Sequence, residues 1–219
     1  MKRVVTFILL LCLVACCCCG IASNYSARKG IDVSHHNRID WSEMKENEIE
    51  FCFIKLTEGG SFVDNKAGDH CRSARGNGMK VGFYHYFRTD VSGKTQLESF
   101  KRQLGKYKYD LIPVIDIEDN GNDYSRTDEV KAELRTFIEG FKETYGYYPI
   151  VYYGSFNACR FPSVTRKCIG WYRTVYLPKI IPFRLQQVKI KRFKCGKVDI
   201  NHCADLSRIT IYQAEASEQ

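Results

Sequence analysis

The sequence predicts one α/β domain, folded as a single irregular TIM-like (β/α) barrel with about eight strands and fewer than eight helices. Three observations support this fold. From Gly30 onward, short β-like runs alternate with amphipathic helical runs, which is typical of a parallel sheet with crossover helices. The β-like runs number eight, as a closed β/α barrel requires. With 219 residues, 44% of them hydrophobic, the chain can bury one sizeable core.

The predicted strands are short apolar runs bounded by glycine, proline or polar residues. They are residues 30–34, 51–57, 80–87, 111–118, 150–153, 168–172, 185–188 and 197–200. Little room remains for a helix between the last two strands. We therefore expect the barrel to be irregular at that point.

Three helices are predicted from apolar residues that recur at helical spacing. The clearest spans residues 127–145, with a capping box offered by residues 125–128 and a stop at Gly146. The other two cover residues 65–77 and 95–104, and a glycine follows each of them.

The N-terminal segment, residues 1–22, has a basic start and then an apolar stretch of about a dozen residues, as secretory signals do. That stretch is too short for an ordinary membrane span. A Leu-Val-Ala-Cys sequence ending at Cys16 resembles a bacterial lipobox, in which this cysteine carries a membrane-attaching lipid; a plain cleaved signal is the alternative. Both predict an exported protein that is secreted, periplasmic or lipid-anchored in the cell envelope. We expect a polar linker at 23–29, the folded domain at 30–212 and a polar tail at 213–219.

Eleven cysteines divide into five in the leader and six in the body. Six in an exported chain permit up to three disulfides, whose pairing the sequence leaves open. Cys159 with Cys168 and Cys195 with Cys203 are the short loops to test first. Because no Cys-x-x-Cys occurs among the six body cysteines and the five histidines lack ligand-like spacing, we expect neither a metal site nor a cofactor.

The formal net charge of +8 has a local source in one late basic segment. Its members are Arg184, Lys189, Lys191, Arg192, Lys194 and Lys197. Such a segment can favour an anionic polymer, such as cell wall or nucleic acid, but a solvated basic face is the favoured interpretation. No recognisable nucleic-acid-binding module accompanies it, so we expect no nucleic-acid partner.

Two acids, Asp116 and Glu118, follow a buried apolar run. Alternate residues of a strand face the same side, so both carboxyl groups should point into one pocket, about 6.5–7 Å apart. Each carboxylate disfavours ionisation of the other, so one can stay protonated and act as an acid. The alternative is that they merely end a strand, bind a cation or pair with basic residues.

Further polar and aromatic residues occupy corresponding strand ends. Because the first and last strands of a closed barrel are neighbours, Asp32 and Asp199 should lie side by side at the same mouth. Hydrogen bonding between these two at the barrel seam is the alternative to a role in the site. About half of the aromatic residues nearby should pack outward, whereas the others could stack on sugar rings. The candidates are Tyr84, His85, Tyr86, Tyr153 and Tyr172.

Seven segments, in order along the chain, resemble the lysozymes of glycoside hydrolase family 25. They are Gly-Ile-Asp-Val-Ser-His-His-Asn (30–37), Ile-Asp-Trp (39–41), Phe-Ile-Lys-Leu-Thr-Glu-Gly (53–59), Gly-Phe-Tyr-His-Tyr-Phe (82–87), Pro-Val-Ile-Asp-Ile-Glu (113–118), Tyr-Pro-Ile-Val-Tyr-Tyr-Gly (148–154) and Val-Asp-Ile-Asn (198–201). Together they span nearly all of the chain after the leader.

The resemblance implies an irregular barrel that cleaves the β-1,4 bond between N-acetylmuramic acid and N-acetylglucosamine in peptidoglycan. It implies Glu118 as general acid/base, with Asp116, Asp32 and Asp199 around the reacting sugar. We favour a route in which Asp116 orients the N-acetyl group of the substrate. The expected separation of the carboxyl groups lies between the retaining class, at about 5–5.5 Å, and the inverting class, at roughly 6.5–9.5 Å, so it does not decide the outcome. We expect a monomer that binds peptidoglycan glycan strands.

The chain departs from the family pattern on the penultimate strand. The family usually carries Trp-Gln-Tyr or Trp-Gln-Phe there, whereas this chain keeps Gln187, a candidate substrate ligand, between Gln186 and Val188. Two other functions therefore remain open. A chitinase-like hydrolase is one, although its Asp-Gly-x-Asp-x-Asp-x-Glu signature is missing, and a non-catalytic protein that binds cell-wall glycan is the other.

Overall fold

The computed structural model describes residues 27–174 and 185–211. Within them, the strands are β1 (Arg28–Val33), β2 (Ile49–Glu58), β3 (Phe62–Val63), β4 (Lys80–Tyr86), β5 (Val114–Ile117), β6 (Ile150–Tyr153), β7 (Ile169–Arg173), β8 (Leu185–Phe193) and β9 (Gly196–Cys203). The helices are α2 (Trp41–Glu46), α3 (Ala67–Gly76), α4 (Gly93–Leu104), α5 (Thr127–Tyr145) and α6 (Pro162–Thr165), with short 3-10 turns η1 (Asn157–Arg160) and η2 (Leu206–Ile209).

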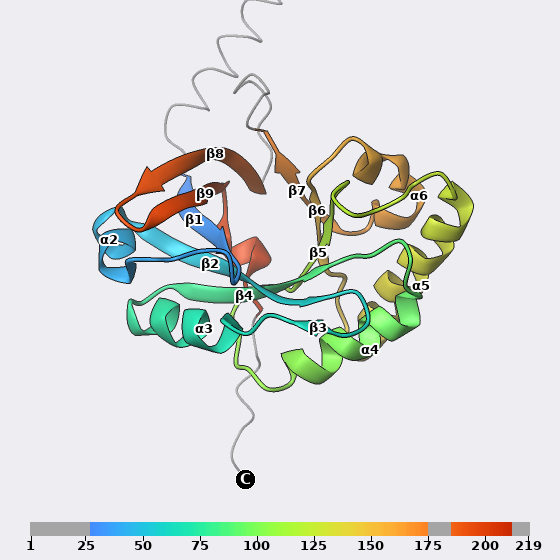
Figure 1. Cartoon of the computed structure of the whole chain (residues 1–219), viewed down its shortest axis with the longest axis horizontal. Helices are drawn as coiled ribbons and strands as arrows, with labels where there is room; N and C mark the ends of the chain where they lie inside the picture. The colour runs from blue at the N-terminus through green and yellow to red at the C-terminus, as the bar shows by residue number, and fades with distance from the viewer. Residues whose placement is uncertain (1–26, 175–184, 212–219) are drawn as a thin grey trace, which may run out of the picture.

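Eight of these strands close into a barrel, as the sequence predicts. Their order around the ring is β1-β9-β8-β7-β6-β5-β4-β2, and β1 pairs again with β2 to close it (Figure 1). The short β3 pairs with β2 outside the ring. The five helices of the described residues are fewer than the strands, which confirms the irregular barrel.

One strand runs against the expected direction. All neighbours in the ring are parallel except β9, which is antiparallel to both β8 and β1. Only two residues, Lys194 and Cys195, separate β8 from β9, and so short a connection can join only antiparallel strands. The expectation of a wholly parallel sheet is therefore wrong here, and the irregularity predicted at this point is a hairpin.

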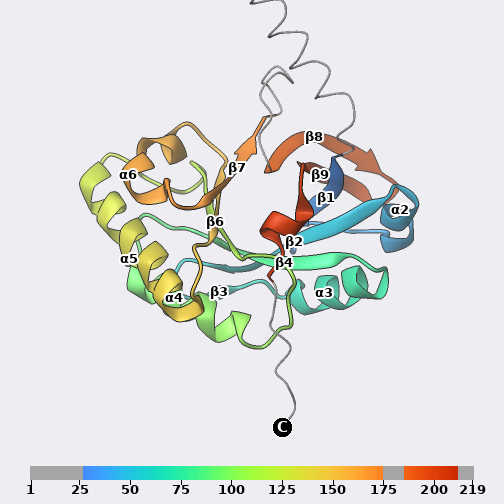
Figure 2. The same cartoon turned by 180° about the vertical axis from the view of Figure 1, so that it is seen from behind.

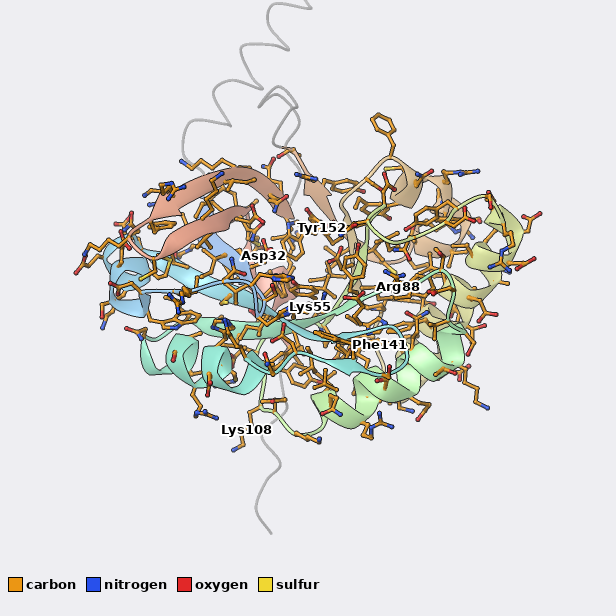
Figure 3. The ribbon with its side chains drawn as sticks, viewed as in Figure 1. Asp32, Lys55, Arg88, Lys108, Phe141 and Tyr152 are labelled. Carbon is orange, nitrogen blue, oxygen red and sulfur yellow. The ribbon has the colours of Figure 1, made fainter. Side chains whose placement is uncertain are left out.

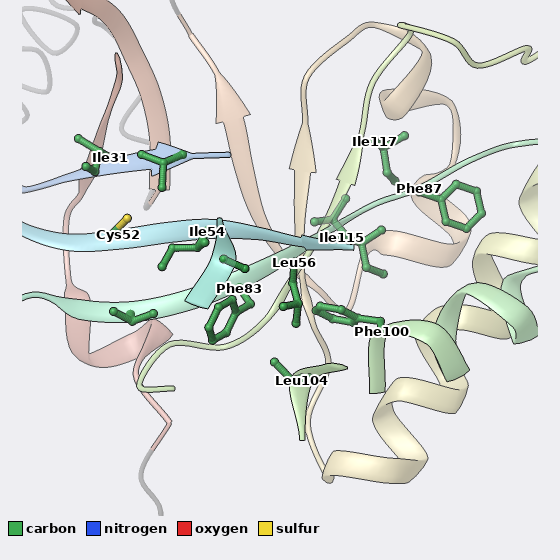
Figure 4. Close-up of a cluster of buried hydrophobic side chains, with 14 of the residues drawn as sticks. Ile31, Cys52, Ile54, Leu56, Phe83, Phe87, Phe100, Leu104, Ile115 and Ile117 are labelled. Atoms are coloured by element: carbon green, nitrogen blue, oxygen red, sulfur yellow. The ribbon is translucent and has the colours of Figure 1, made fainter. Parts of the chain in front are cut away.

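Alternation along the strands separates two apolar layers. Ile54 and Leu56 of β2 face outward and pack with Phe100 of α4 in the larger cluster, which lies between the barrel and its helices (Figure 4). Phe51 and Phe53 face inward and join a second cluster inside the barrel. Helices α3, α4 and α5 lie outside the ring in both views, with α3 and α4 against β2 and α5 against α4 (Figures 1 and 2).

Two glycines make the inner layer possible. A Cβ on Gly30 would come within 2.2 Å of the Phe51 ring, and one on Gly82 within 2.6 Å of the Phe53 ring. These rings fill the lower part of the barrel. Inward positions at its other end are left to polar side chains.

The helix boundaries agree closely with the expected ones. Helix α5 has the predicted bounds, and Gly146 ends it in the left-handed conformation, with φ of 80°. The predicted capping box at residues 125–128 is wrong, because the Ser125 hydroxyl instead donates to Asp123 at 2.9 Å. Helix α4 begins two residues earlier than expected, where Ser92 Oγ accepts a hydrogen bond from the Thr95 amide.

The disulfide predictions fail. All six body cysteines are free thiols. Cys203 ends β9 and Cys195 precedes its start, so at about 3.3 Å per residue their Cα atoms lie roughly 25 Å apart, whereas a disulfide requires less than about 7 Å. Cys159 and Cys168 are likewise unpaired.

Several predictions on chain organisation lie outside the described residues. These concern the leader with Cys16, most of the linker, Arg184 and the tail at 213–219. Strand β1 begins at Arg28, two residues before the expected start of the domain. Among the residues that the structure describes, no helix is long and apolar enough to cross a membrane.

The contact between α4 and α5 depends on Gly93. A Cβ there would come within 1.9 Å of the Glu133 carbonyl oxygen in α5, so we expect Gly93→Ala to push the helices apart. Overpacking of this kind costs about 1–3 kcal/mol and should lower Tm by several degrees in thermal unfolding. The matched control is Gly76→Ala, because a Cβ there meets no atom within 4 Å. Equal Tm values for the two variants would contradict this account of the packing.

Candidate functional site

A cavity of about 340 Å³ opens at the polar end of the barrel. The strands contribute mainly acids, tyrosines and a lysine to its wall. The lining residues are Asp32, Val33, Ser34, His36, Asn37, Lys55, Tyr84, Tyr86, Asp116, Glu118, Asn120, Tyr152, Trp171, Gln187 and Asp199. All four predicted acids are therefore in one cavity.

Asp116 and Glu118 reach the cavity from β5 and the residue that follows it. Ile115 and Ile117 pack outward against the helices, so strand alternation turns Asp116 inward. The side chain of Asp116 is buried, and its Oδ1 has no hydrogen-bond partner among the described residues. Glu118 is more exposed and lies at the cavity wall.

The loop after Glu118 is fixed by backbone contacts. The Glu118 carbonyl oxygen accepts hydrogen bonds from Asn122 Nδ2 at 2.9 Å and from the Tyr124 hydroxyl at 2.8 Å. Asn122 Nδ2 also donates to the Phe87 carbonyl, which links the loop to the end of β4. On the other side, a Cβ on Gly154 would come within 2.5 Å of Glu118 Cγ, so this glycine leaves the space that the side chain occupies.

Asp32 and Asp199 lie opposite each other on the paired strands β1 and β9. Their proximity comes from the antiparallel register, and not from two parallel strand ends as the sequence analysis assumed. The alternative of a direct hydrogen bond between them is wrong, because Asp32 Oδ2 accepts from Asn201 Nδ2 at 2.8 Å. Asn201 Oδ1 in turn accepts from Trp171 Nε1 at 3.2 Å, and Asp199 Oδ1 is left without a partner among the described residues.

The environment of the cavity favours protonated acids. Burial raises the pKa of Asp116 well above its ordinary value, and the neighbouring Glu118 and Asp32 raise it further. Burial likewise raises the pKa of Asp32, and the charge of Asp199 raises it further. Burial also raises the pKa of Glu118 and of Asp199, while the positive charge of Arg173 at the end of β7 opposes both shifts.

A buried lysine stands among these acids. Lys55 is 8% exposed, its Nζ lies 2.7 Å from Glu58 Oε2, and it sits 4.7 Å from the centre of the Tyr86 ring. Figure 3 shows Asp32, Lys55 and Tyr152 near the middle of the molecule, on three different strands. Lys55 is a site residue that was not predicted, although a lysine within the largely apolar run 51–57 is a signal for one.

The predicted substrate ligands divide into two groups. Tyr84, Tyr86 and Gln187 line the cavity, as expected of inward-facing residues. His85, Tyr153 and Tyr172 do not line it, because they alternate to the outer face of the barrel.

His85 is fully buried, hydrogen-bonds to Thr57 and Gln96, and stacks 5.1 Å from the Phe137 ring. Burial lowers its pKa to about 4. Tyr153 and Tyr172 stack on each other at 4.8 Å with an angle of 7° between the rings. The expectation that these three contact substrate is wrong, because the other face of each strand forms the cavity.

Two aromatic residues of the wall were not predicted as ligands. Tyr152 donates a hydrogen bond to Gln187 Oε1 at 2.7 Å, and Trp171 lies on the neighbouring strand β7. Register partners on neighbouring strands face the same side of the sheet. Tyr152 is the partner of Asp116, and Trp171 is the partner of Tyr152, so both rings face the cavity as Asp116 does. They provide aromatic surface near Gln187, although Gln186 and Val188 are not aromatic.

No metal site accompanies the acids in the part of the chain that is described. Over residues 27–174 and 185–211, no group of three or more His, Cys, Asp or Glu side chains has an arrangement suited to a metal ion.

Comparison with curated proteins finds relatives over somewhat more than half of the chain. The chain is 33% identical over 132 residues to the uncharacterized protein YegX of Escherichia coli K12, covering 58% of this chain and 48% of that protein. It is also 33% identical over 125 residues to Lysozyme M1 of Streptomyces globisporus, covering 55% of this chain and 42% of that protein. The matched region is therefore less than half the length of either relative.

Solved structures and a family model give a consistent result. The family 25 glycosyl hydrolase of Bacillus anthracis has a TM-score of 0.67 and 30% identity to this chain, covering 83% of this chain and 90% of its own. The family model described as "Glycosyl hydrolases family 25" matches residues 31–160, which is more than half of the chain and includes Asp32, Asp116 and Glu118. This chain belongs to glycosyl hydrolase family 25.

Proposed function

We propose that the protein is a lysozyme that hydrolyses the β-1,4 bond between N-acetylmuramic acid and N-acetylglucosamine in peptidoglycan. The observation that carries the proposal is the group of four acids with raised pKa values in one cavity of a family 25 barrel. Relatives support it, since this chain is 33% identical over 125 residues to Lysozyme M1 and 30% identical over 112 residues to the autolytic lysozyme of Clostridium acetobutylicum.

Glu118 is the general acid in this proposal. Its raised pKa keeps a proton on the carboxyl group at a pH where an ordinary glutamic acid would be ionised. It is also the more exposed member of the pair with Asp116, so its carboxyl group can reach a glycosidic oxygen in the cavity. The proton moves to the leaving oxygen as the bond to the anomeric carbon breaks.

Asp116 acts on the N-acetyl group of the substrate. The carbonyl oxygen of that group attacks the anomeric carbon and forms a cyclic oxazolinium, while Asp116 holds the amide N–H. Water then opens the ring and gives a proton back to Glu118, so the anomeric configuration is retained. The unpartnered Oδ1 of Asp116 is an acceptor available for this amide.

The remaining wall binds and stabilises the sugar. Asp32 and Asp199 support the positive charge that develops at the anomeric carbon, or accept hydrogen bonds from sugar hydroxyls. Tyr84, Tyr86 and Trp171 offer aromatic surface for stacking, and Gln187 offers an amide. This arrangement needs no cofactor.

We also propose that the protein acts outside the cytoplasm. A peptidoglycan substrate requires export, which agrees with the signal expected in residues 1–22. We further propose that a lipid on Cys16 attaches the protein to the cell envelope. There it acts on glycan strands as a monomer.

The first test is digestion of purified peptidoglycan by the full chain, with mass spectrometry of the soluble fragments. We expect fragments that end in reducing N-acetylmuramic acid, with the retained anomer formed first in NMR spectra. Glu118→Gln should lower turnover by about 10²–10⁴-fold, because the amide cannot donate the proton.

The matched control is Glu98→Gln, an exposed acid on α4 that pairs with Lys101. It should keep the turnover of the unaltered protein. Fragments with reducing N-acetylglucosamine, release from chitin alone, or tight binding of peptidoglycan without soluble fragments would each refute the proposed activity.

A second prediction concerns the cost of the buried acids to stability. Asp116 has a raised pKa in the folded state, so folding favours its neutral form, and stability falls as pH rises through that raised value. Asp116→Asn removes this penalty and should raise Tm by a few degrees at neutral pH while lowering turnover. The gain should vanish near about pH 3, where the aspartic acid is already neutral.

Asp123→Asn is the contrasting control. Hydrogen bonds from Ser125 lower the pKa of Asp123, so its charged form is favoured in the fold and its loss should not stabilise the protein. A Tm gain for Asp116→Asn that persists unchanged at acidic pH would argue against this electrostatic explanation.

A third prediction tests the space beside Glu118. The Cβ of Gly154→Ala would displace the Glu118 side chain, and a misplacement of about 1 Å can cost around 10²-fold in rate. We expect such a loss of turnover with a smaller effect on Tm, since the Cβ meets side-chain atoms of Glu118 and Tyr152 and no backbone atom among its nearest neighbours. Gly105→Ala, whose Cβ would lie at an ordinary 3.5 Å from its neighbour, serves as control. Full activity of Gly154→Ala would mean that Glu118 is not held in this way.

A further inference from the structure

A second, smaller hollow of about 120 Å³ lies on the outer face of the wall formed by β1, β9 and β8. This wall separates it from the cavity described above, which lies on the inner face. Its lining includes Lys29, Lys189, Lys191, His202, Asn47 and Phe193. The four basic residues belong to neither the glycan cavity nor the apolar core, whereas Phe193 packs in the outer apolar cluster and Asn47 caps the end of α2.

An irregularity in β8 turns the lysines toward this hollow. Gln187 pairs with Asn201 and faces inward, whereas Lys189 pairs with Ile200, so Val188 is an extra residue without a partner. Strict alternation from Gln187 would have turned Lys189 inward, and the bulge reverses this. The extra residue Val188 therefore lets β8 present Gln187 to the glycan cavity and Lys189 to the basic hollow on the opposite face.

The positive charge here is only partly neutralised. Lys29 pairs with Glu48 at 2.7 Å, but Lys191 Nζ donates to a neutral oxygen, Asn47 Oδ1, at 2.7 Å and lies 4.6 Å from the centre of the Phe193 ring. In the described residues, no carboxylate lies within ion-pair distance of Lys189 or Lys191.

Neither acid of the flanking helix α2, Glu43 or Glu46, forms an ion pair with a lysine of the hollow in the described residues. Glu43 of α2 accepts from the backbone amide of Lys194 at 3.0 Å. Beyond the hollow, Lys194 lies in the turn of the hairpin, whereas Arg192 and Lys197 pair with each other on the face opposite to Lys189 and Lys191. They have no ion-pair partner in the described part of the chain either.

We propose that the hollow and hairpin bind the phosphate groups of an anionic phosphodiester polymer. A lysine ammonium group is a point charge that can approach a tetrahedral phosphate from several directions, and the three lysines of the hollow offer such groups on one face. Lys194 in the turn, with Arg192 and Lys197 on the opposite face, extends the positive charge around the tip of the hairpin. A ligand with repeated negative charges can contact several of these groups at once, which a single anion cannot.

The binding site is independent of glycan cleavage, since the two sites open on opposite faces of one wall. A polymer held at the hairpin would leave the catalytic cavity open. Such contact would keep the protein close to a surface that carries both the polymer and its glycan substrate.

The test measures binding of poly(glycerol phosphate) to the full chain carrying Glu118→Gln, so that hydrolysis cannot interfere. We expect Lys189→Gln/Lys191→Gln to weaken binding at least tenfold. Lys189→Arg/Lys191→Arg, which keeps the charge, should retain most of the binding. Excess inorganic phosphate should compete with the polymer.

The control for net charge is Lys106→Gln/Lys108→Gln, which removes two charges near the end of α4, where Figure 3 places Lys108 far from the hairpin. It should change binding less than twofold, and Tm should be the same for all variants. Equal weakening by both glutamine pairs, or no binding by the parent chain, would overturn the proposal. Tighter binding to polyglutamate, or to phosphatidylglycerol vesicles, would reassign the surface to carboxylates or to membranes.

Discussion

The two-residue period of a strand in a closed ring is the constraint on which the rest of this structure depends. Each strand has one face against the helices and one face toward the barrel interior, so every residue is assigned to core or site by its parity. On β5 this places Ile115 and Ile117 in the outer core and Asp116 in the cavity. A shift of one residue would exchange the two sets completely.

The four acids at the polar end of this ring lower the free energy of unfolding. Desolvation raises the pKa of each, and their proximity adds to the effect for Asp116 and Asp32. Partial compensation comes from the hydrogen bond that Asn201 donates to Asp32, and from the positive charges of Lys55 and Arg173. The apolar packing below and around the site supplies the stability that this group of like charges lowers.

Much of the fold could be predicted because its signals are local. Helix α5 has both its apolar spacing and its terminal glycine within one segment, and its bounds agree with the prediction. The four acids could likewise be assigned to one cavity, although Asp199 lies within β9 and not at a strand end. The direction of β9 could not be predicted from its own residues, because it depends on the two-residue turn that precedes it.

The errors within the site have a common cause. His85 and Tyr86 are adjacent and equally suited by type, so composition alone cannot tell which faces the cavity. They can be told apart only from the strand register, in which Tyr86 is the partner of the inward-facing Asp116 and His85 is the partner of the outward-facing Ile115. Lys55 was missed for a related reason, since its partner Glu58 and the ring of Tyr86 are brought to it by the fold.

The antiparallel last strand also bears on how the chain is made. During synthesis β1 can pair with β2 as soon as residues 49–58 emerge, but its other edge has no partner until the final strand, residues 196–203, leaves the ribosome. Until then this edge is open to other chains, and Arg28 and Lys29 give it the charge that discourages such pairing. Asp32 lies on the same edge, so its buried environment is completed only when the C-terminal strand arrives.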